Sequence, residues 1–339
     1  VEVGWKSMLY LTLTGRNDWA SQLANSSTSS FFYPSVGLSG VISEMIQMPS
    51  FIDYMKVRGS FSSVGMPYPR NLTSPTYEYN EATQSWKPKT HYPIGDLKPE
   101  RTDSWEVGLD MKLFKDFNLG LSWYLANTFN QTFDPQISVS SGYTTIYLQT
   151  GYVRNTGLEL SLGYGHTWNN NFRWDSNFTL SHNKNKIKEL VRDYVHPETG
   201  ELINKDRLDV GGLGKARFIL KEGGTLGDLY TQSDLKRDDN GMVDIDPTGI
   251  VAIENNLPDI KLGSVFPKAN LAWSNHFSWK GISLSALFTA RIGGIVYSAT
   301  EAAMDQYGVS ERSALARDNG GVLVNNRTLV DAQNYYTTI

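Results

Sequence analysis

The sequence contains no cysteine among its 339 residues. This absence excludes disulfide frameworks, thiolate metal sites and cysteine nucleophiles. The sequence also lacks any run of the ~18 consecutive apolar residues that a membrane-spanning helix needs, and its mean hydropathy is -0.36. These two features exclude a helical membrane protein. They do not exclude a membrane β-barrel, because only every second residue of a barrel strand faces lipid.

The chain has no block of basic residues, and its formal net charge is -4 at pH 7. Nucleic acid is therefore not an expected partner. No signal peptide opens the sequence, because Val1 starts directly inside an alternating pattern. A protein of the outer membrane must be exported and needs a signal peptide. For an outer-membrane location we therefore expect the protein to begin upstream of this sequence.

The residues that usually carry out catalysis form no recognisable constellation. The five histidines are scattered, with neither the spacing of a zinc motif nor cysteine partners. No nucleophile elbow and no phosphate-binding loop occurs in the sequence. The sequence therefore predicts no catalytic residue, no cofactor and no metal ligand, and it predicts that the protein is not an enzyme.

One acidic run, Asp238-Asp239-Asn240-Gly241, superficially suggests a calcium-binding loop. When the run is aligned on its glycine, Lys236 and Pro247 occupy the positions where the EF-hand needs an acid and a bidentate glutamate. The EF-hand pattern therefore fails at both positions, and whether the loop binds calcium in another way is left open by the sequence. Asn240-Gly241 instead predicts a type I′ hairpin turn within a longer connection.

Residues 101–129 predict a two-stranded hairpin with one apolar and one polar face. Apolar and polar positions alternate on both sides of a break at Lys115-Asp116, as side chains alternate between the two faces of a strand. The apolar positions are Trp105, Val107, Leu109, Met111, Leu113, Phe117, Leu119, Leu121, Trp123 and Leu125. Each arm is about ten residues long, the length that a tilted strand needs to cross a bilayer. A soluble antiparallel sheet packed on a core shows the same alternation.

The alternation recurs along the chain and is interrupted by polar connections. It predicts further strands over residues 1–14, 31–43, 55–62, 158–168, 172–180, 271–279 and 282–292. The connections alternate between long and short, and residues 183–267 and the tail from residue 294 are predicted to be irregular. In an up-and-down barrel every second connection lies at the same end, and outer-membrane barrels combine short periplasmic turns with long external loops. Sandwiches and Greek keys lack this asymmetry.

Aromatic residues on the apolar face predict two girdles, one at each membrane interface. The predicted girdle residues are Trp5, Trp105, Phe117, Trp168, Phe172, Trp273 and Trp279. With the order of the connections, they favour an all-β fold that is part of a large antiparallel up-and-down transmembrane β-barrel, with about ten strands in this chain.

Charged residues on the polar face are the candidates for lining the lumen. They are Glu106, Asp110, Glu159, Arg173, Asp175 and Arg291, and Arg58 and Lys112 share their face. The alternative is that they are solvated residues in contact with water. Aromatic residues in the connections are candidates for contact with a substrate or a partner protein, and they can equally pack the loops against one another. These candidates are Tyr68, Tyr77, Tyr79, Trp86, Tyr143 and Tyr147.

Several stretches of the sequence resemble one family of membrane proteins. They are SFFYPSVGLS from Ser30, YMKVRGSFSSVG from Tyr54, LKPERTDSWEVGLD from Leu97, VRNTGLELSL from Val153, LSHNKNKI from Leu180, EGGTLGDLY from Glu222, SNHFSWKGISLSALFTARIGG from Ser274 and DAQNYY from Asp331. In these stretches the chain resembles the SusC/RagA-like TonB-dependent outer-membrane transporters. The resemblance extends over essentially the whole chain.

The resemblance implies that residues 1–339 are part of one barrel domain of about 22 strands with a plugged lumen. The N-terminal plug, the TonB box and the last strands of such a protein lie outside this sequence. The resemblance also implies an outer-membrane location in contact with lipid, and TonB-dependent import of an oligosaccharide or oligopeptide under a SusD-like lipoprotein lid. A passive porin, a soluble β-sandwich adhesin or lectin, and an enzyme built on a barrel are the alternatives.

The alternation also predicts how individual residues are oriented. Leu109, Leu121, Leu160 and Phe288 are expected to face lipid, and Glu106, Ser122, Glu159 and Thr289 to face the lumen. Residues 65–100, 130–155 and 183–267 are expected to form much of the contact with the lid. A deletion of residues 184–262 is expected to remove no strand.

Overall fold

A computed structural model describes residues 1–23, 26–66, 78–87, 91–92, 98–133, 145–146, 148–168, 171–195, 200 and 202–338. The chain forms two compact units. The first comprises residues 1–208, 220–226 and 267–294, and the second comprises residues 209–219, 227–266 and 295–339. The assignment of the whole chain to one barrel domain stays a prediction.

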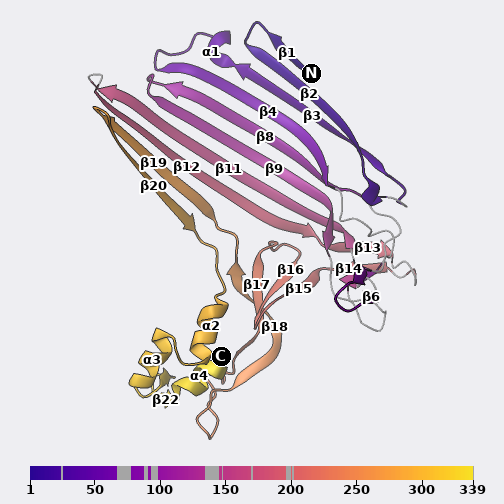
Figure 1. Cartoon of the computed structure of the whole chain (residues 1–339), viewed down its shortest axis with the longest axis vertical. Helices are drawn as coiled ribbons and strands as arrows, with labels where there is room; N and C mark the ends of the chain where they lie inside the picture. The colour runs from indigo at the N-terminus through magenta and orange to yellow at the C-terminus, as the bar shows by residue number, and fades with distance from the viewer. Residues whose placement is uncertain are drawn as a thin grey trace. The chain divides into compact units, whose positions relative to one another are not determined.

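The first unit is built on a ten-stranded antiparallel sheet (Figure 1). In order across the sheet, its strands are β1 (Glu2–Trp5), β2 (Leu9–Trp19), β3 (Ser30–Val41), β4 (Ile52–Met66), β8 (Glu100–Leu113), β9 (Phe117–Phe133), β11 (Leu148–Trp168), β12 (Phe172–Glu189), β19 (Ala269–Trp279) and β20 (Ile282–Ile292). The order across the sheet follows the order along the chain, so the sheet is an up-and-down meander with β1 and β20 at its edges. The all-β prediction and the expected number of strands are confirmed.

One face of this sheet is apolar and the other is polar. Cross-strand pairing produces a row of leucines across five strands, formed by Leu109, Leu121, Leu160, Leu180 and Leu271. The next row, on the opposite face, is formed by Asp110, Gly120, Ser161, Thr179 and Ala272. A slip of one residue in any pair would exchange the two faces. The cross-strand register therefore places the apolar and polar residues on the two faces that the sequence alternation predicts.

Three of the short connections are tight turns whose two central residues both have positive φ. They are Lys6 (51°) and Ser7 (56°), Phe114 (50°) and Lys115 (64°), and Lys280 (47°) and Gly281 (87°). Positive φ at both positions defines the type I′ turn, whose twist matches that of the paired strands. The prediction of one strand over residues 1–14 is therefore wrong, because the chain reverses at Lys6 and Ser7. Neither is asparagine or glycine, so the sequence lacks the usual signal for this turn.

The connections of the sheet largely follow the predicted alternation. The short ones are residues 6–8, 42–51, 114–116, 169–171 and 280–281, and the long ones are residues 20–29, 67–99, 134–147 and 190–268. The alternation is not strict at the start of the chain, because residues 20–29 and 42–51 are equally long. From residue 67 onward each long connection is followed by a shorter one.

The central strands are longer than predicted. β9 has 17 residues, β11 has 21 and β12 has 18. β9 and β11 therefore enter the predicted connection over residues 130–155, and β12 continues to Glu189. The sequence pattern loses these strand ends because the side chains change in polarity while the backbone pairing continues.

Short elements lie within the connections. They are η1 (Ser21–Leu23), α1 (Ile42–Met45), β5 (Glu78–Asn80), β6 (Ser85–Lys87), β7 (His91–Tyr92), β10 (Thr145–Ile146), β13 (Val191–Val195) and β14 (Leu202–Lys205). β5 pairs with β6, β7 with β10, and β13 with β14.

The second unit contains regular structure where the sequence predicts irregular chain. β15 (Arg207–Leu213), β16 (Ala216–Lys221), β17 (Asp228–Leu235) and β18 (Ile253–Ser264) form a four-stranded sheet. The tail forms α2 (Ala299–Gln306), α3 (Glu311–Asp318), β21 (Val322–Val324), β22 (Thr328–Val330) and α4 (Ala332–Thr338). Val243, Val251, Val324 and Val330 are buried together as one apolar core. The prediction of irregular structure over residues 183–267 and after residue 294 is therefore wrong. A deletion of residues 184–262 would also remove strands, because it includes the end of β12.

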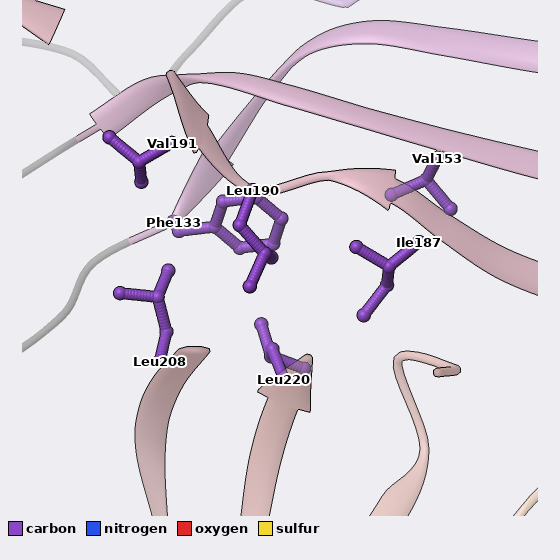
Figure 2. Close-up of a cluster of buried hydrophobic side chains, with 7 residues drawn as sticks. All are labelled: Phe133, Val153, Ile187, Leu190, Val191, Leu208 and Leu220. Carbon is purple, nitrogen blue, oxygen red and sulfur yellow. The ribbon is translucent and has the colours of Figure 1, made fainter. Parts of the chain in front are cut away.

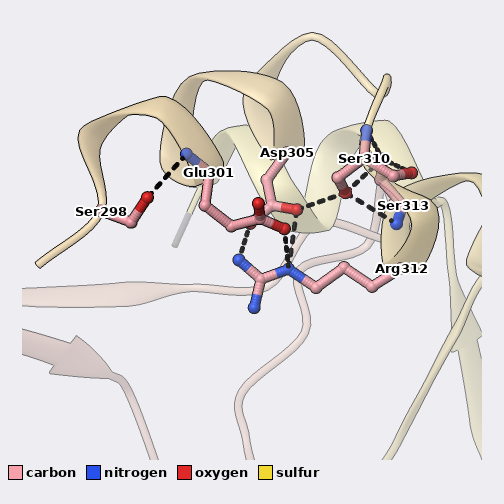
Figure 3. Close-up of polar contacts among 6 residues, drawn as sticks. All are labelled: Ser298, Glu301, Asp305, Ser310, Arg312 and Ser313. Carbon is pink, nitrogen blue, oxygen red and sulfur yellow. Dashed lines mark hydrogen bonds and ion pairs between the residues drawn. The ribbon is translucent and has the colours of Figure 1, made fainter. Parts of the chain in front are cut away.

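Helices α2 and α3 are joined by a polar cluster around Asp305, which is 6% exposed (Figure 3). The hydroxyl of Ser310 donates to Asp305 Oδ1 at 2.6 Å, and Arg312 Nε donates to the same oxygen at 2.7 Å. Ser310 is also the N-cap of α3 and forms a capping box with Ser313. The buried carboxylate therefore fixes the start of α3 against the end of α2. No helix in the described part of the chain has both the length and the apolar character to span a membrane.

A second buried cluster lies in the first unit, where β9, β11 and β12 extend beyond the neighbouring strands. It consists of Phe133, Val153, Ile187, Leu190, Val191, Leu208 and Leu220, whose side chains converge in Figure 2. Val153 and Ile187 are at most 1% exposed. This core fixes the long ends of the central strands at the end of the sheet that bears the long connections.

Candidate functional site

A hollow of about 770 Å³ lies on the polar face of the ten-stranded sheet. Side chains from β4, β8, β9, β11, β12, β19 and β20 line it, and they include Arg58, Asp110, Ser122, Glu159, Ser161, Thr179, Ser181, Thr289 and Arg291. A single hollow shared by seven neighbouring strands requires the sheet to be concave on this face. Three of the predicted lumen residues, Asp110, Glu159 and Arg291, thus share one concave site.

Arg58 on β4 is the centre of the polar contacts in the hollow. Its guanidinium donates to Asp110 Oδ2 at 2.7 Å, to Ser122 Oγ at 2.6 Å and to Glu106 Oε1 at 3.3 Å. These partners lie on β8 and β9, so one side chain links three strands. A Cβ atom at Gly108 would lie 2.6 Å from the Arg58 guanidinium carbon. The missing side chain at this position therefore allows the arginine to lie flat across β8.

Sequence reasoning placed Arg58 on the polar face but did not select it as a site residue. Its role depends on Gly108, which lies directly opposite Arg58 in the register of β4 and β8. An arginine on a polar face next to a strand glycine is the only sequence signal of this arrangement, and it requires the register to be known.

The remaining lumen candidates form a separate group near the short connections. Arg173 donates from Nε and Nη2 to the two carboxylate oxygens of Asp175, at 2.7 and 2.6 Å. Neither residue lines the hollow around Arg58. The six candidates thus divide into a central group and this bidentate pair, and their exposure to a lumen stays a prediction.

Aromatic residues gather on the apolar face near the short connections. Ring centroids are 4.7 Å apart for Phe117 and Tyr164, 5.3 Å for Tyr164 and Trp174, and 5.9 Å for Trp174 and Phe277. Of the predicted girdle residues, Trp168 packs on Phe172, Trp105 on Phe61 and Trp273 on Phe288, while Trp5 and Trp279 are exposed. Tyr164, Trp174 and Phe277 join this set although we did not select them from the sequence.

Only part of the predicted loop aromatics can be placed. Tyr79 and Trp86 face each other across the β5–β6 hairpin, with ring centroids 5.1 Å apart. They are 50% and 66% exposed, respectively. Tyr68, Tyr77, Tyr143 and Tyr147 lie outside the described residues.

The acidic run at Asp238 forms a turn, although not the predicted one. Gly241 has a φ of 78°, whereas the φ of Asn240 is not positive, so the turn is not of type I′. Asp238 Oδ1 accepts hydrogen bonds from the backbone N–H groups of Asn240 and Met242, both at 2.9 Å. These two hydrogen bonds hold the backbone of the turn, in which Gly241 rather than Asn240 has the positive φ.

Asp246 repeats this turn eight residues later, where Gly249 has a φ of 84°. Hydrogen bonds from the Thr248 hydroxyl and the Ile250 N–H lower the pKa of the Asp246 carboxyl. Both aspartates are therefore engaged with their own turns. Within the described ranges, no three His, Asp or Glu side chains are grouped closely enough to hold a metal ion.

Three of the sequence stretches that carry the family resemblance meet beside β12. Asn155 Oδ1 accepts hydrogen bonds from the side-chain amides of Asn183 and Asn185 at 3.3 and 3.0 Å. Asn185 Oδ1 accepts from the backbone N–H of Leu226 at 2.9 Å. Ile187 exchanges backbone hydrogen bonds with Gly223 and Gly224. Residues 222–226 therefore pair with β12 beyond the end of β19, and these asparagines have a structural role.

The fold and the chemistry of its two faces define the class of protein. A meander of long antiparallel strands with one apolar face, aromatic residues near its short turns and long connections between strands is the wall of an outer-membrane β-barrel. The chain belongs to the family of TonB dependent receptor-like β-barrels, whose model matches residues 1–211. The predicted outer-membrane location and the resemblance to SusC/RagA-like transporters are confirmed.

Individual relatives support the same assignment. TonB-dependent receptor P39 of Formosa agariphila is 27% identical over 239 residues, which cover 68% of this chain and 21% of the relative. TonB-dependent receptor P26 of the same organism is 26% identical over 319 residues, which cover 87% and 31%. The solved structure of the RagAB peptide transporter matches with a TM-score of 0.66 at 21% identity, over 85% of this chain and 32% of that chain. The chain thus spans about a fifth to a third of the length of these relatives.

Proposed function

We propose that this chain is part of a transporter that imports a large nutrient across the outer membrane, driven by the TonB complex. The family assignment over residues 1–211 is the observation that supports this most directly. The hollow on the polar face adds a concave surface of charged and hydroxyl groups, which suits a solvated and hydrogen-bonding cargo. The chain acts by binding and passage, without chemistry on the cargo.

In this proposal the apolar face contacts lipid and the polar face lines the lumen. Arg58, Glu106 and Asp110 then present a fixed charge cluster to the plug or to the cargo. Glu159 lines the same hollow and forms no hydrogen bond or ion pair with other residues that the structure describes. Its carboxylate is therefore the acidic group of the hollow that is most available to a cargo.

The proposed cargo is an oligopeptide or an oligosaccharide. RagAB is described as a peptide transporter and as a peptide importer, which supports the oligopeptide. The exposed Tyr79 and Trp86 rings suit either class, because an aromatic surface stacks on sugar rings and on apolar side chains alike. We further propose a SusD-like lipoprotein as a lid over the end with the long connections, since segments of this length are usually functional.

The full-length protein in its native outer membrane is the system for testing the proposal. Uptake of fluorescent oligopeptides and oligosaccharides is measured in the wild type, in a deletion of its gene and in a strain without TonB. We expect one cargo class to enter only when both the gene and TonB are present. Uptake that needs the gene but persists without TonB would show a passive porin and overturn the proposal.

A further inference from the structure

The polarity of the two sheet faces reverses along β11 and β12. On the side of the reversal toward the short connections, the face with Leu160 and Leu180 is apolar. On the side toward the long connections, that same face bears Arg154 and Lys186, which are cross-strand partners. The opposite face changes in the other direction, from polar residues to Val153 and Ile187 in the buried cluster of Figure 2. The ends of these strands near the long connections are thus apolar on the inner face and charged on the outer face, as in a protein that is surrounded by water.

In the proposed orientation, with the apolar face in contact with lipid, the reversal marks the edge of the membrane. A tilted strand crosses the hydrocarbon layer in about 9–11 residues. Counted from Trp168 beside the short connection, that length ends near Leu158. Trp123 and Trp105 lie on the apolar face near the same level, since Leu158 pairs with Trp123 and Trp105 pairs with Leu125. Arg154 and Lys186 therefore lie at the level of the lipid headgroups.

Charged and polar residues form a continuous row at this level on the outward face, and basic residues predominate on and beside it. Asp103, Asn127, Arg154 and Lys186 are successive cross-strand partners over four strands. Lys184 lies on the adjacent row, opposite Thr156. Arg101 lies over the Phe129 ring at 5.7 Å and donates to Asp103 at 2.7 Å. The group therefore has four cations and one carboxylate, Asp103. Glu189, which pairs with Tyr152 in the next row, forms an ion pair with Arg192.

The neighbours of Arg154 hold its side chain in place without forming an ion pair with it. Arg154 donates to Asn127 Oδ1 at 2.8 Å and to the Tyr152 hydroxyl at 2.5 Å. Both acceptors are uncharged, so neither of them offsets the positive charge of the guanidinium. Lys184 is exposed and Lys186 is half-buried, and neither forms an ion pair with other residues that the structure describes. An ordered arginine beside unpaired lysines is an arrangement that binds phosphate groups.

We propose that Arg101, Arg154, Lys184 and Lys186 bind the phosphate groups of a lipid in the outer leaflet. The site lies on the outward face, so it is separate from the transport route and goes beyond the proposed import function. It requires that the apolar face contacts lipid. The lipid chains pack on the apolar surface below, beside Trp123 and Leu158, while the phosphates reach the basic group.

The test uses the full-length protein in detergent and three probes, which are monophosphoryl lipid A, its dephosphorylated form and inorganic phosphate. Binding is measured by native mass spectrometry and by fluorescence titration. The Lys184→Gln/Lys186→Gln variant should weaken binding of the phosphorylated lipid roughly tenfold or more, since each basic residue contributes to attraction at the headgroup level. The Lys56→Gln/Lys112→Gln variant makes the same charge change on the inner face and should bind normally.

Each result supports or overturns the proposal. Equal affinity for the dephosphorylated lipid, or unchanged affinity in the Lys184→Gln/Lys186→Gln variant, removes the proposed site. If inorganic phosphate competes at the same concentration as the lipid, the residues form a site for free anions, and this result also removes the proposed lipid site. Loss of binding in the inner-face variant alone would place the bound lipid elsewhere and would also remove the proposed site. The assay needs no TonB and no cargo, so failure of the transport proposal would not change its outcome.

Discussion

Gly108 lacks a side chain, and this makes room for the contacts of Arg58 on the polar face. An alanine there would place its Cβ 2.6 Å from the Arg58 guanidinium, so the flexible arginine would move and lose Glu106 and Asp110. We expect Gly108→Ala to destabilise the full-length protein by about 0.5–1 kcal/mol relative to Gly120→Ala, because the groups are partly solvated. Gly120 is the matched control, since its Cβ would meet only ordinary contacts at 3.6 Å. The measurement is urea unfolding followed by the heat-modifiable gel shift.

The Arg58→Gln background tests this cause. When the arginine is absent, Gly108→Ala should cost no more than Gly120→Ala. An equal cost in both backgrounds would instead locate the strain in the backbone of β8.

Leu121 tests the orientation of the sheet toward lipid. It lies in the middle of the leucine row, between Leu109 and Leu160. An arginine at this depth on the lipid face should cost about 2–4 kcal/mol, because a charge is moved into hydrocarbon. Ser161→Arg is the matched control in the next row, and it should cost less than about 1 kcal/mol if that row faces a watery lumen. A larger loss from Ser161→Arg than from Leu121→Arg in the same unfolding assay would contradict the orientation.

At this scale the sequence predicts which residues share a face of the sheet, but it does not predict which of them are in contact. Leu109, Leu121 and Leu160 could be predicted to lie together because alternation alone sets their face. The contacts of Arg58 could not be predicted, because they depend on the pairing of β4 with β8 across the long connection. The turn at Asp238 was predicted wrongly because its own carboxylate, rather than the Asn-Gly pair, determines the backbone conformation.

At the scale of elements, the sequence identifies the middle of the strands from β3 to β20 in the ten-stranded sheet, and it loses the ends of the central strands near the long connections. In the proposed orientation, the ends of β11 and β12 near the long connections continue beyond the lipid, where water surrounds the outer face and a buried core covers the inner face. Alternation persists there with its sense reversed, as Val153 and Arg154 show. Most strands of the second unit are short, although β18 has 12 residues, and they pack around residues that are distant in sequence, such as Val243 and Val330. Local periodicity therefore did not reveal them.

The β5–β6 hairpin tests the proposed contact with a lid. Its exposed Tyr79 and Trp86 lie in the connection over residues 67–99, outside the ten-stranded sheet. Replacing residues 78–87 by a Gly/Ser segment of equal length should leave barrel assembly intact, as judged by the heat-modifiable band. It should reduce co-purification of the lid lipoprotein severalfold, because exposed aromatic residues often dominate an interface. Thr83→Ala, at the turn of the same hairpin, is the control. Unchanged co-purification would exclude this hairpin from the interface.

At the scale of the whole molecule, the ten-stranded sheet has two edges that determine its stability. β1 and β20 each pair with one neighbour, so the other side of each strand presents backbone N–H and C=O groups without a strand partner in the described structure. In lipid each such group costs several kcal/mol. β20 has eleven residues, and about half of their backbone groups would be exposed in this way. The combined free-energy cost of these groups exceeds the typical stability of a folded domain, about 5–15 kcal/mol.

We therefore expect residues 1–339 expressed by themselves to aggregate or to remain unfolded in detergent, whereas the full-length protein gives a heat-modifiable band. The apolar face alone does not rescue the fragment, since detergent can cover the leucine row but cannot supply a ladder of hydrogen bonds along β20. The comparison is made by gel shift and limited proteolysis in the same detergent. A protease-resistant, heat-modifiable species from residues 1–339 alone would show that the edges are satisfied within this chain or between two copies of it, and a change of mass on cross-linking would separate those two cases.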